Sequence, residues 1–328
     1  KNLVRDKVLG LYQEPFWWEI VENGFDKSCK VALISDMNND KVLLPLFFHK
    51  IGPILRIGSP LQGTFTPYMG FIHLCDDISL SDEDSYWSYL ITYLHKMGAH
   101  WIEISTTSEK KVIKGCSNFV YKTPETIVLN TNNNEDFLWQ NMQGRSRNLV
   151  RKAEKFGLKA SILKSSDTDV ELFYSMLKKT FKKSGKSPPH SLRFYKLIAS
   201  HTMNADHLLF LSIQKGVKTV SMGMFLYNLR GMHFISGTST REGNKYGANN
   251  LMHWEVIKFA CKHGIEYYDF GGLGIPSIDK FKRSFGGNNV KYRRYIWMNS
   301  FVKFLFNIAM KVKDILPFIR QELKRFKR

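Results

Sequence analysis

The segment at residues 265–287 holds the residues of this chain that are best placed for chemistry. It reads IEYYDFGGLGIPSIDKFKRSFGG, so a β-rich run ends in Asp269 and two glycines follow. A carboxylate at a strand end can accept a proton or orient a ligand, and it can equally cap the glycine loop behind it. In α/β proteins, ligands bind where strand ends meet glycine loops. The compact basic segment at 280–283 then supplies cations next to that loop.

A second candidate is the loop at residues 238–251, which reads TSTREGNKYGANNL. Its glycines, at positions 243 and 247, permit close approach of a ligand to the backbone. The helix that follows offers free N–H groups and the positive end of its dipole to a phosphate, and Arg241 and Lys245 add charge. The loop lacks the glycine spacing of a dinucleotide fingerprint and the Gly-Lys-Ser/Thr of a P-loop, so an ordinary glycine-rich turn is the competing interpretation.

A third candidate is a basic segment at residues 136–156, which the spacing predicts to be one helix that stops at Gly157. Apolar residues recur at helical intervals and predict a buried stripe: Leu138, Met142, Leu149, Ala153 and Phe156. Basic residues fall on the other faces: Arg145, Arg147, Arg151 and Lys152. These residues can hold a phosphate or a backbone polyanion, or they can form a solvated helix surface.

Alternating helical and extended segments must position these residues, and they predict an α/β protein with mixed sheets. In the first half, helices are expected at 16–23 and 86–97 and strands at 31–35, 42–49 and 101–105. In the second half, three successive antiparallel strands are expected at 208–213, 219–227 and 232–237. A helix at 249–263 and a strand at 265–270 follow, and this crossover predicts parallel pairing of the strands that flank it. A last strand is expected at 290–298.

The charge of the chain is unevenly distributed. The 328 residues carry a formal net charge of +19, yet residues 1–140 hold 13 Lys and Arg against 17 Asp and Glu, and residues 141–328 hold 35 against 12. A basic half of this kind favours a polyanionic partner: nucleic acid, an anionic membrane or a phosphorylated substrate. Solubility alone is the alternative explanation.

Cysteine usage and hydropathy bound the environment of the chain. The four cysteines have no paired spacing, which favours a reducing compartment and argues against a zinc site or a disulfide framework: Cys29, Cys75, Cys116 and Cys261. No signal peptide and no membrane-spanning segment are expected. We therefore predict a cytoplasmic protein without a metal site.

The polar run at 130–134 predicts a domain boundary, so we expect domains at 1–134 and 135–299 and a separate tail at 300–328. Apolar residues of the tail line one helical face until Pro317: Phe301, Phe304, Leu305, Ile308, Ala309, Val312, Ile315 and Leu316. Residues 301–328 also hold eight Lys and Arg against two acidic residues. This composition suits a helix on an anionic membrane surface, or a helix packed on its own domain with a basic solvent face.

The order of these motifs resembles the Fem-type peptidoglycan bridge-forming aminoacyltransferases and the BioF2-like acyltransferases of the GNAT superfamily. The resemblance covers about residues 15–298. It rests on Lys245-Tyr246 with Asn249-Asn250-Leu251-Met252-His253-Trp254-Glu255, on Tyr268-Asp269-Phe270-Gly271-Gly272, on Phe281-Lys282 with Phe285-Gly286-Gly287, and on the basic helix at 145–157. The stretches Leu44-Pro45-Leu46 and Thr66-Pro67-Tyr68-Met69-Gly70 resemble the first domain of that family.

The resemblance implies two GNAT-like domains in tandem and transfer of an aminoacyl or acyl group to an amine or hydroxyl. The donor would be aminoacyl-tRNA or an acyl-thioester such as acyl-CoA, used as a co-substrate with no tightly bound cofactor. The acceptor would be a cell-envelope precursor such as a muropeptide. The chain has no long charged heptad hairpin, which sets it apart from the larger Fem enzymes.

The family motif implies roles for individual residues. Lys282 would contact a donor phosphate or the oxyanion, or would be a surface lysine of a basic patch, and Asp269 is the other catalytic candidate. Donor or phosphate contacts would come from Arg241, Lys245, Tyr246, Asn249, Arg145, Arg147, Arg151 and Lys152. A non-catalytic RNA- or membrane-binding protein that retained the fold is the alternative.

Overall fold

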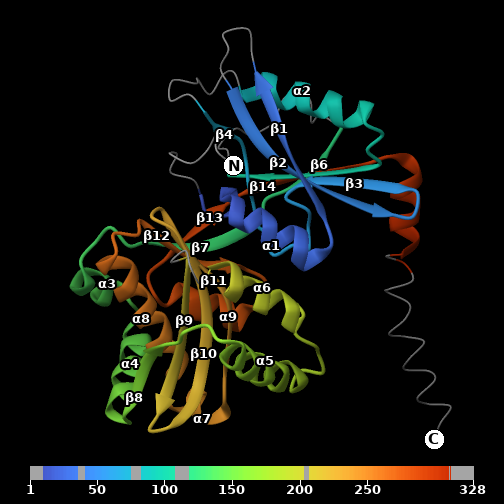
Figure 1. The fold of residues 1–328 in the computed structure, drawn as a ribbon. Helices are drawn as coiled ribbons and strands as arrows, with labels where there is room; N and C mark the ends of the chain where they lie inside the picture. The colour runs from blue at the N-terminus through green and yellow to red at the C-terminus, as the bar shows by residue number, and fades with distance from the viewer. Residues whose placement is uncertain are drawn as a thin grey trace, which may run out of the picture. The chain divides into compact units, whose positions relative to one another are not determined.

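The computed structural model describes residues 10–35, 41–74, 83–107, 118–202, 207–309 and 311. It forms two compact units, each built on its own β-sheet (Figure 1). Unit 1 contains Lys1–Cys29 and Thr123–Tyr292, and unit 2 contains Lys30–Lys122 and Arg293–Arg328. The chain therefore passes between the units three times. The polar break at 130–134, which suggested consecutive domains, lies near the second of these crossings.

The sheet of unit 1 has the strand order β13-β7-β12-β11-β10-β9-β8. Its strands are β7 (Glu125–Asn130), β8 (Leu158–Ile162), β9 (Leu208–Lys215), β10 (Lys218–Tyr227), β11 (Gly231–Ser239), β12 (Tyr267–Gly272) and β13 (Asn288–Lys291). Strands β9, β10 and β11 pair antiparallel, as predicted, and β11 pairs parallel with β12 across the predicted crossover. The α/β prediction with mixed sheets is confirmed.

The helices of unit 1 are η2 (Leu11–Gln13), α1 (Pro15–Phe25), α3 (Glu135–Asn141), α4 (Gly144–Lys155), α5 (Asp167–Lys182), α6 (Leu192–Thr202), α7 (Arg241–Tyr246), α8 (Ala248–Lys262) and α9 (Pro276–Arg283). The crossover helix α8 is the central helix of the hydrophobic core. It buries residues on nearly every side, among them Leu251, Val256 and Ile257. A helix that is apolar all round belongs in an interior, which explains why α8 joins the two parallel strands from inside the unit.

The prediction of a single helix at 136–156 was wrong, because the chain breaks into α3 and α4. The backbone of Met142 and of Gln143 is extended, and the Gln143 N–H donates a hydrogen bond to the Ser284 carbonyl oxygen at 2.9 Å. The break changes the phase of the buried stripe, so that Val150 is buried in α4 while Phe156 is 45 % exposed. A contact from the end of α9 thus overrides the local helical pattern.

The sheet of unit 2 has the strand order β1-β2-β3-β5-β14-β6, with β4 paired to β2. Its elements are β1 (Ser28–Ser35), β2 (Lys41–Ile51), β3 (Ile54–Ser59), β4 (Ile72–His73), α2 (Glu83–Lys96), β5 (Trp101–Thr106), β6 (Val120–Lys122) and β14 (Arg293–Met298). The single strand predicted at 290–298 was wrong: β13 belongs to unit 1, and β14 lies between β5 and β6 in unit 2.

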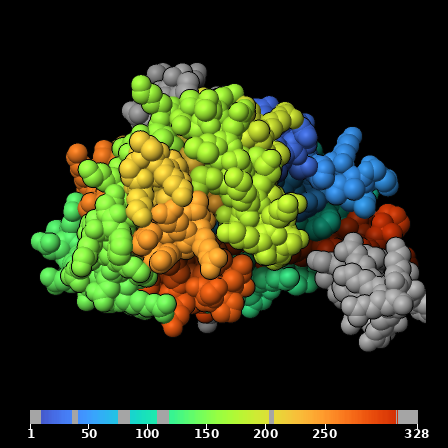
Figure 2. Space-filling model, turned by 90° about the horizontal axis from the view of Figure 1, so that it is seen from below, coloured from blue at the N-terminus to red at the C-terminus, as the bar shows by residue number. Residues whose placement is uncertain are grey.

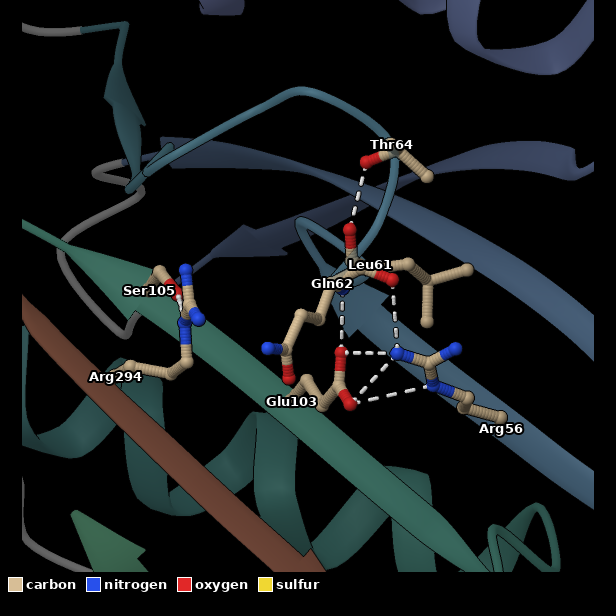
Figure 3. Close-up of polar contacts among 7 residues, drawn as sticks. All are labelled: Arg56, Leu61, Gln62, Thr64, Glu103, Ser105 and Arg294. Atoms are coloured by element: carbon tan, nitrogen blue, oxygen red, sulfur yellow. Dashed lines mark hydrogen bonds and ion pairs between the residues drawn. The ribbon is translucent and has the colours of Figure 1, made fainter. Parts of the chain in front are cut away.

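A buried ion pair holds the loop that follows β3 in unit 2 (Figure 3). The carboxylate of Glu103 is 1 % exposed and accepts hydrogen bonds from Nε and Nη2 of Arg56, at 3.2 and 2.8 Å. It also accepts the Gln62 backbone N–H at 2.6 Å. The Arg56 guanidinium lies 4.5 Å from the ring centroid of Trp101. The pair therefore ties the loop to β3 and β5, since both strands contribute a charged partner.

Residues 300–309 are helical, and the remainder of the predicted tail at 300–328, apart from residue 311, lies outside the described residues. Within the part of the chain that the structure describes, no helix combines the length and the apolar composition needed to cross a bilayer. Cys29 and Cys261 are free thiols, while Cys75 and Cys116 fall in undescribed segments.

Candidate active site

Asp269 lies on β12 just before a tight glycine turn, and it is 2 % exposed. Its Oδ1 accepts the Gly271 N–H at 2.7 Å and the hydroxyl of Thr126 on β7. Gly271 has φ +81°, a left-handed conformation that glycine adopts without strain. Of the two roles open to Asp269, capping of the glycine turn is the one that the contacts display.

Lys282 binds the same turn from the opposite direction. It lies on α9, is 9 % exposed, and its Nζ donates to the carbonyl oxygens of Gly271 and Gly272, at 2.9 and 2.6 Å. A lysine ammonium has three N–H donors, so these two bonds leave one for a ligand. Burial lowers the pKa of Lys282, and the carboxylates of Asp269 and Asp279 partly oppose that shift. Lys282 is therefore a buried residue of the turn and not a surface lysine.

Strand β12, which carries Asp269, separates from β11 at this point. The pairing register of β11 and β12 runs from Gly231 opposite Tyr267 to His233 opposite Asp269, although β11 continues to Ser239 and β12 to Gly272. The glycine turn therefore begins where the parallel pairing ends. A diverging pair of parallel strands exposes backbone hydrogen-bonding groups that a ligand can use.

Sequence reasoning missed the polar groups that surround Asp269. His233 is buried with its Nδ1 3.7 Å from Oδ2 of Asp269 and its Nε2 3.3 Å from the hydroxyl of Tyr267. The ring of Tyr12, from the N-terminal segment, packs edge-on to His233 at 4.7 Å. Burial lowers the pKa of His233, and the charge of Asp269 acts in the opposite direction. Thr126 and His233 reach Asp269 only through the pairing of β7, β12 and β11. No pattern of neighbouring residues in the sequence could therefore have identified them.

His253 lies on the core side of α8 amid aromatic rings, including those of Phe281 and Phe285 at 5.3 and 5.5 Å. Its Nδ1 lies 2.7 Å from the hydroxyl of Tyr268. Burial, aided by the charge of Lys282, lowers the pKa of His253 to about 3. The imidazole is therefore neutral at physiological pH, and it packs as a core residue beside the α9 end of the site.

The neutral state of His253 predicts acid sensitivity. Below pH ~6.5 the unfolded chain binds a proton at this ring, whereas the folded chain does not bind it until pH falls to about 3. Stability must therefore fall as pH falls, by ~2 kcal/mol between pH 6.5 and 5 for this one proton. We expect the His253→Phe variant to lose this part of the pH dependence of the unfolding free energy, measured by urea unfolding at about pH 6.5 and pH 5. The exposed His263→Phe variant is the control, and equal slopes in both variants would contradict the expectation.

The contacts of Asp269 predict different outcomes for two substitutions. Asp269→Ala leaves the partly buried Gly271 N–H and the buried Thr126 hydroxyl without their acceptor, which we expect to lower the free energy of unfolding by ~2 kcal/mol. Asp269→Asn retains the side-chain oxygen and should lose under ~1 kcal/mol. If Asp269 positions the turn, the Asn variant keeps most of its activity. If it is a proton acceptor, both variants lose activity equally.

A second cluster gathers around Tyr246 at the end of α7. The Lys152 Nζ, from α4, donates to the Lys245 carbonyl oxygen at 2.9 Å, and the Lys215 Nζ lies 4.4 Å from the Tyr246 ring centroid. Glu242 forms ion pairs with Lys215 and with Lys218. Figure 2 shows α4 in green, the β9–β10 hairpin in gold and α7 in orange beside one another on this face. Three of the residues that were predicted to bind the acyl donor are thus brought together: Lys152, Lys245 and Tyr246.

The glycines of this loop are packed closely, which favours the ordinary glycine-rich turn of the two interpretations that the sequence left open. A Cβ on Gly247 would lie 2.5 Å from the Leu149 carbonyl oxygen of α4, and one on Gly243 would lie 2.6 Å from the Val220 carbonyl oxygen of β10. Asn249, in the first turn of α8, accepts a hydrogen bond from the Ser221 hydroxyl at 2.9 Å. The loop is therefore packed against α4 and the sheet, and Lys245 and Tyr246 are its remaining candidates for binding a ligand.

The predicted arginines lie elsewhere. The Nη1 of Arg147 donates to the carbonyl oxygens of Trp139 and Gln140, at the end of α3, and Arg151 lies 5.3 Å from the Trp139 ring centroid. Arg145 and Arg241 are exposed on α4 and α7. Arg147 and Arg151 thus stabilise the junction of α3 and α4, whereas Lys152 reaches the Tyr246 cluster.

Helix α8 connects the two clusters. Tyr246 precedes it by two residues, and His253, which packs against α9, lies about 8 Å along its axis from Ala248. Both clusters therefore belong to unit 1, and α8 follows one of them and packs through His253 against the helix that carries Lys282. Among the described residues, no group of three or more His, Cys, Asp and Glu side chains could hold a common metal ion.

Comparison with known proteins shows what this part of the chain is similar to. A family model described as an acetyltransferase (GNAT) domain matches residues 140–283, which include α4, α7, α8, β12 and Lys282. A stretch of 117 residues is 26 % identical to the aminoacyltransferase FemB of Staphylococcus epidermidis. That stretch covers 33 % of this chain and 27 % of FemB, so about a quarter of FemB is matched.

Solved structures show the fold over nearly the whole chain. The crystal structure of FemX superposes with a TM-score of 0.72 at 13 % identity and covers 93 % of this chain and 96 % of FemX. The C-terminal domain of a putative lysylphosphatidylglycerol synthetase from Agrobacterium fabrum gives a TM-score of 0.52 at 9 % identity, over 85 % and 92 % of the two chains. Residues 140–283 thus match the model of an acetyltransferase (GNAT) domain, and the fold of the chain is similar to that of FemX.

Proposed function

We propose that this chain is a Fem-type acyltransferase. It transfers an aminoacyl or acyl group from an activated carrier, aminoacyl-tRNA or acyl-CoA, to an amine or hydroxyl of a cell-envelope precursor such as a muropeptide. The GNAT domain at 140–283 and the similarity to FemB support transfer as the reaction class. The donor is a co-substrate, and no tightly bound cofactor takes part.

The observation that carries the proposal is the buried Lys282 with one N–H left beside the point where β11 and β12 separate. In acyl transfer to an amine, the nitrogen forms a bond to the carbonyl carbon while the bond to the carrier oxygen or sulfur breaks. The amine proton ends on the released carrier, and the acyl carbonyl oxygen bears negative charge in between. The remaining N–H of Lys282 is suited to stabilise that charge, because it is preorganised and shielded from water.

The cluster around Tyr246 supports an anionic carrier as the donor. Lys152 and Lys245 converge there, and the whole second half of the chain is basic. Salt dependence separates the two donor classes, because each phosphate contact that forms releases counterions and so steepens the slope of log K against log salt. We expect tRNA to give a steep slope and acyl-CoA a shallow one.

The test is donor binding followed by transfer. The purified chain is incubated with labelled aminoacyl-tRNA or acyl-CoA and with muropeptide precursors as acceptors, and labelled product is separated. The proposal expects product with one donor class. Failure to bind either donor class and to form product would overturn it.

The basic half also favours a second candidate, a non-catalytic RNA- or membrane-binding protein that retains the fold. This candidate expects salt-sensitive polyanion binding without turnover, unchanged in Lys282→Ala. Turnover that Lys282→Ala abolishes would exclude it. For the enzyme, we propose action in the cytoplasm, where activated carriers and muropeptide precursors are made.

A further inference from the structure

The helix at residues 300–309 of unit 2 has an exposed apolar face. Phe301, Phe304, Leu305 and Ile308 are 54, 62, 38 and 44 % exposed. Their spacing of i, i+3, i+4 and i+7 places all four on one side of the helix. Large apolar side chains gathered in this way mark an interaction surface, whereas single exposed ones do not.

The helix is attached to unit 2 through a different side. Val302 is 2 % exposed, and the ring of Phe306 lies 6.0 Å from that of Trp101 on β5. Residues 302 and 306 are one helical turn apart and point about 130° away from the exposed face, at 100° of rotation per residue. The helix is thus held by the side that carries the buried Val302 and the partly exposed Phe306, and it presents Phe301 and Phe304 on another side.

The basic residues of this segment favour an anionic partner for this face. Lys303 and Lys311 lie on the exposed helix, and residues 301–328 carry eight Lys and Arg against two acidic residues. Such a surplus repels a second copy of the same segment and attracts an anionic surface, by ~1 kcal/mol for each basic residue near the lipid headgroups. Apolar side chains on one face with lysines beside them are the features of a helix that lies in a membrane interface.

We propose that the helix at 300–309 docks on an anionic lipid bilayer, with Phe301, Phe304, Leu305 and Ile308 inserted below the headgroups. This attachment needs no membrane-spanning helix. It is independent of the transfer reaction, because it involves unit 2 and requires neither donor nor acceptor.

The experiment is vesicle flotation with the full chain, using phosphatidylcholine vesicles with and without 30 % phosphatidylglycerol, a composition we choose for the test. We expect binding to the anionic vesicles and a loss of at least about tenfold in partitioning for the double variant Phe301→Ser/Phe304→Ser. The matched control is Tyr89→Ser/Tyr93→Ser, which removes two exposed aromatic residues from α2 of the same unit and should bind as the unaltered chain does.

A second measurement does not depend on whether the double serine variant folds correctly. Phe304→Trp places a fluorophore on the face, and its emission should shift to shorter wavelength on addition of anionic vesicles. Three results would overturn the proposal: no binding by the unaltered chain, equal binding by both double variants, or a concentration-dependent dimer that the Phe301→Ser/Phe304→Ser change dissolves.

Discussion

Lys282→Ala is expected to lower kcat by about 100- to 1000-fold, the loss measured when one preorganised donor to an oxyanion is removed. Lys282 is suited to this role because two of its N–H groups are fixed on Gly271 and Gly272 and the third is left for the substrate. Steady-state transfer assays with saturating donor and acceptor measure the effect. The same N–H predicts that activity is present below the lowered pKa of Lys282 and is lost as pH rises through it.

The matched control for this prediction is Lys280→Ala. Lys280 lies two residues away on the same helix and is exposed, so its loss removes one positive charge without touching the glycine turn. Its kcat should stay within about twofold of the unaltered chain, since surface charges are screened. A Lys282→Ala enzyme as active as Lys280→Ala would exclude Lys282 from the chemistry.

Arg56→Met in unit 2 should lower the free energy of unfolding by ~3–5 kcal/mol, because it leaves the buried carboxylate of Glu103 without its charged partner. The remaining donor that the contacts give Glu103, the Gln62 backbone N–H, cannot replace a guanidinium that supplies bonds from both Nε and Nη2. Urea unfolding monitored by tryptophan fluorescence measures the loss.

Two further variants decide whether charge burial is the cause. Gln62→Ala keeps the backbone N–H and removes an exposed side chain, so it should change stability by less than ~0.5 kcal/mol. The double variant Arg56→Met/Glu103→Leu removes both charges and should recover most of the loss, since apolar residues often replace a buried ion pair without cost. A double variant as unstable as Arg56→Met would point to packing of the loop instead.

The sequence predicted those features that are set by neighbours along the chain. The strands β9 to β11, the crossover helix α8 and the parallel pair β11–β12 all follow from local periodicity and connection length. The segment around Asp269 and Lys282 could be singled out as a candidate site for the same reason, because strand, glycines and basic residues lie within 23 positions.

Features that depend on distant pairing were missed. Thr126 reaches Asp269 across 143 positions, and the break between α3 and α4 is fixed by Ser284, which lies 141 positions after Gln143. Arg147 and Lys152 look alike in the sequence, yet one binds the end of α3 and the other the Lys245 carbonyl. Periodicity predicts which face of a helix is buried, but it does not predict which residues the polar faces contact.

The place of β14 in unit 2 has a consequence for synthesis on the ribosome. Residues 30–122 emerge early, but their sheet has a vacant slot between β5 and β6 until residues 293–298 have been translated. For that interval two strand edges lie open, and open edges recruit other chains. Nascent chains stalled before Arg293 should therefore be held by chaperones or aggregate, although all of unit 1 has by then been made.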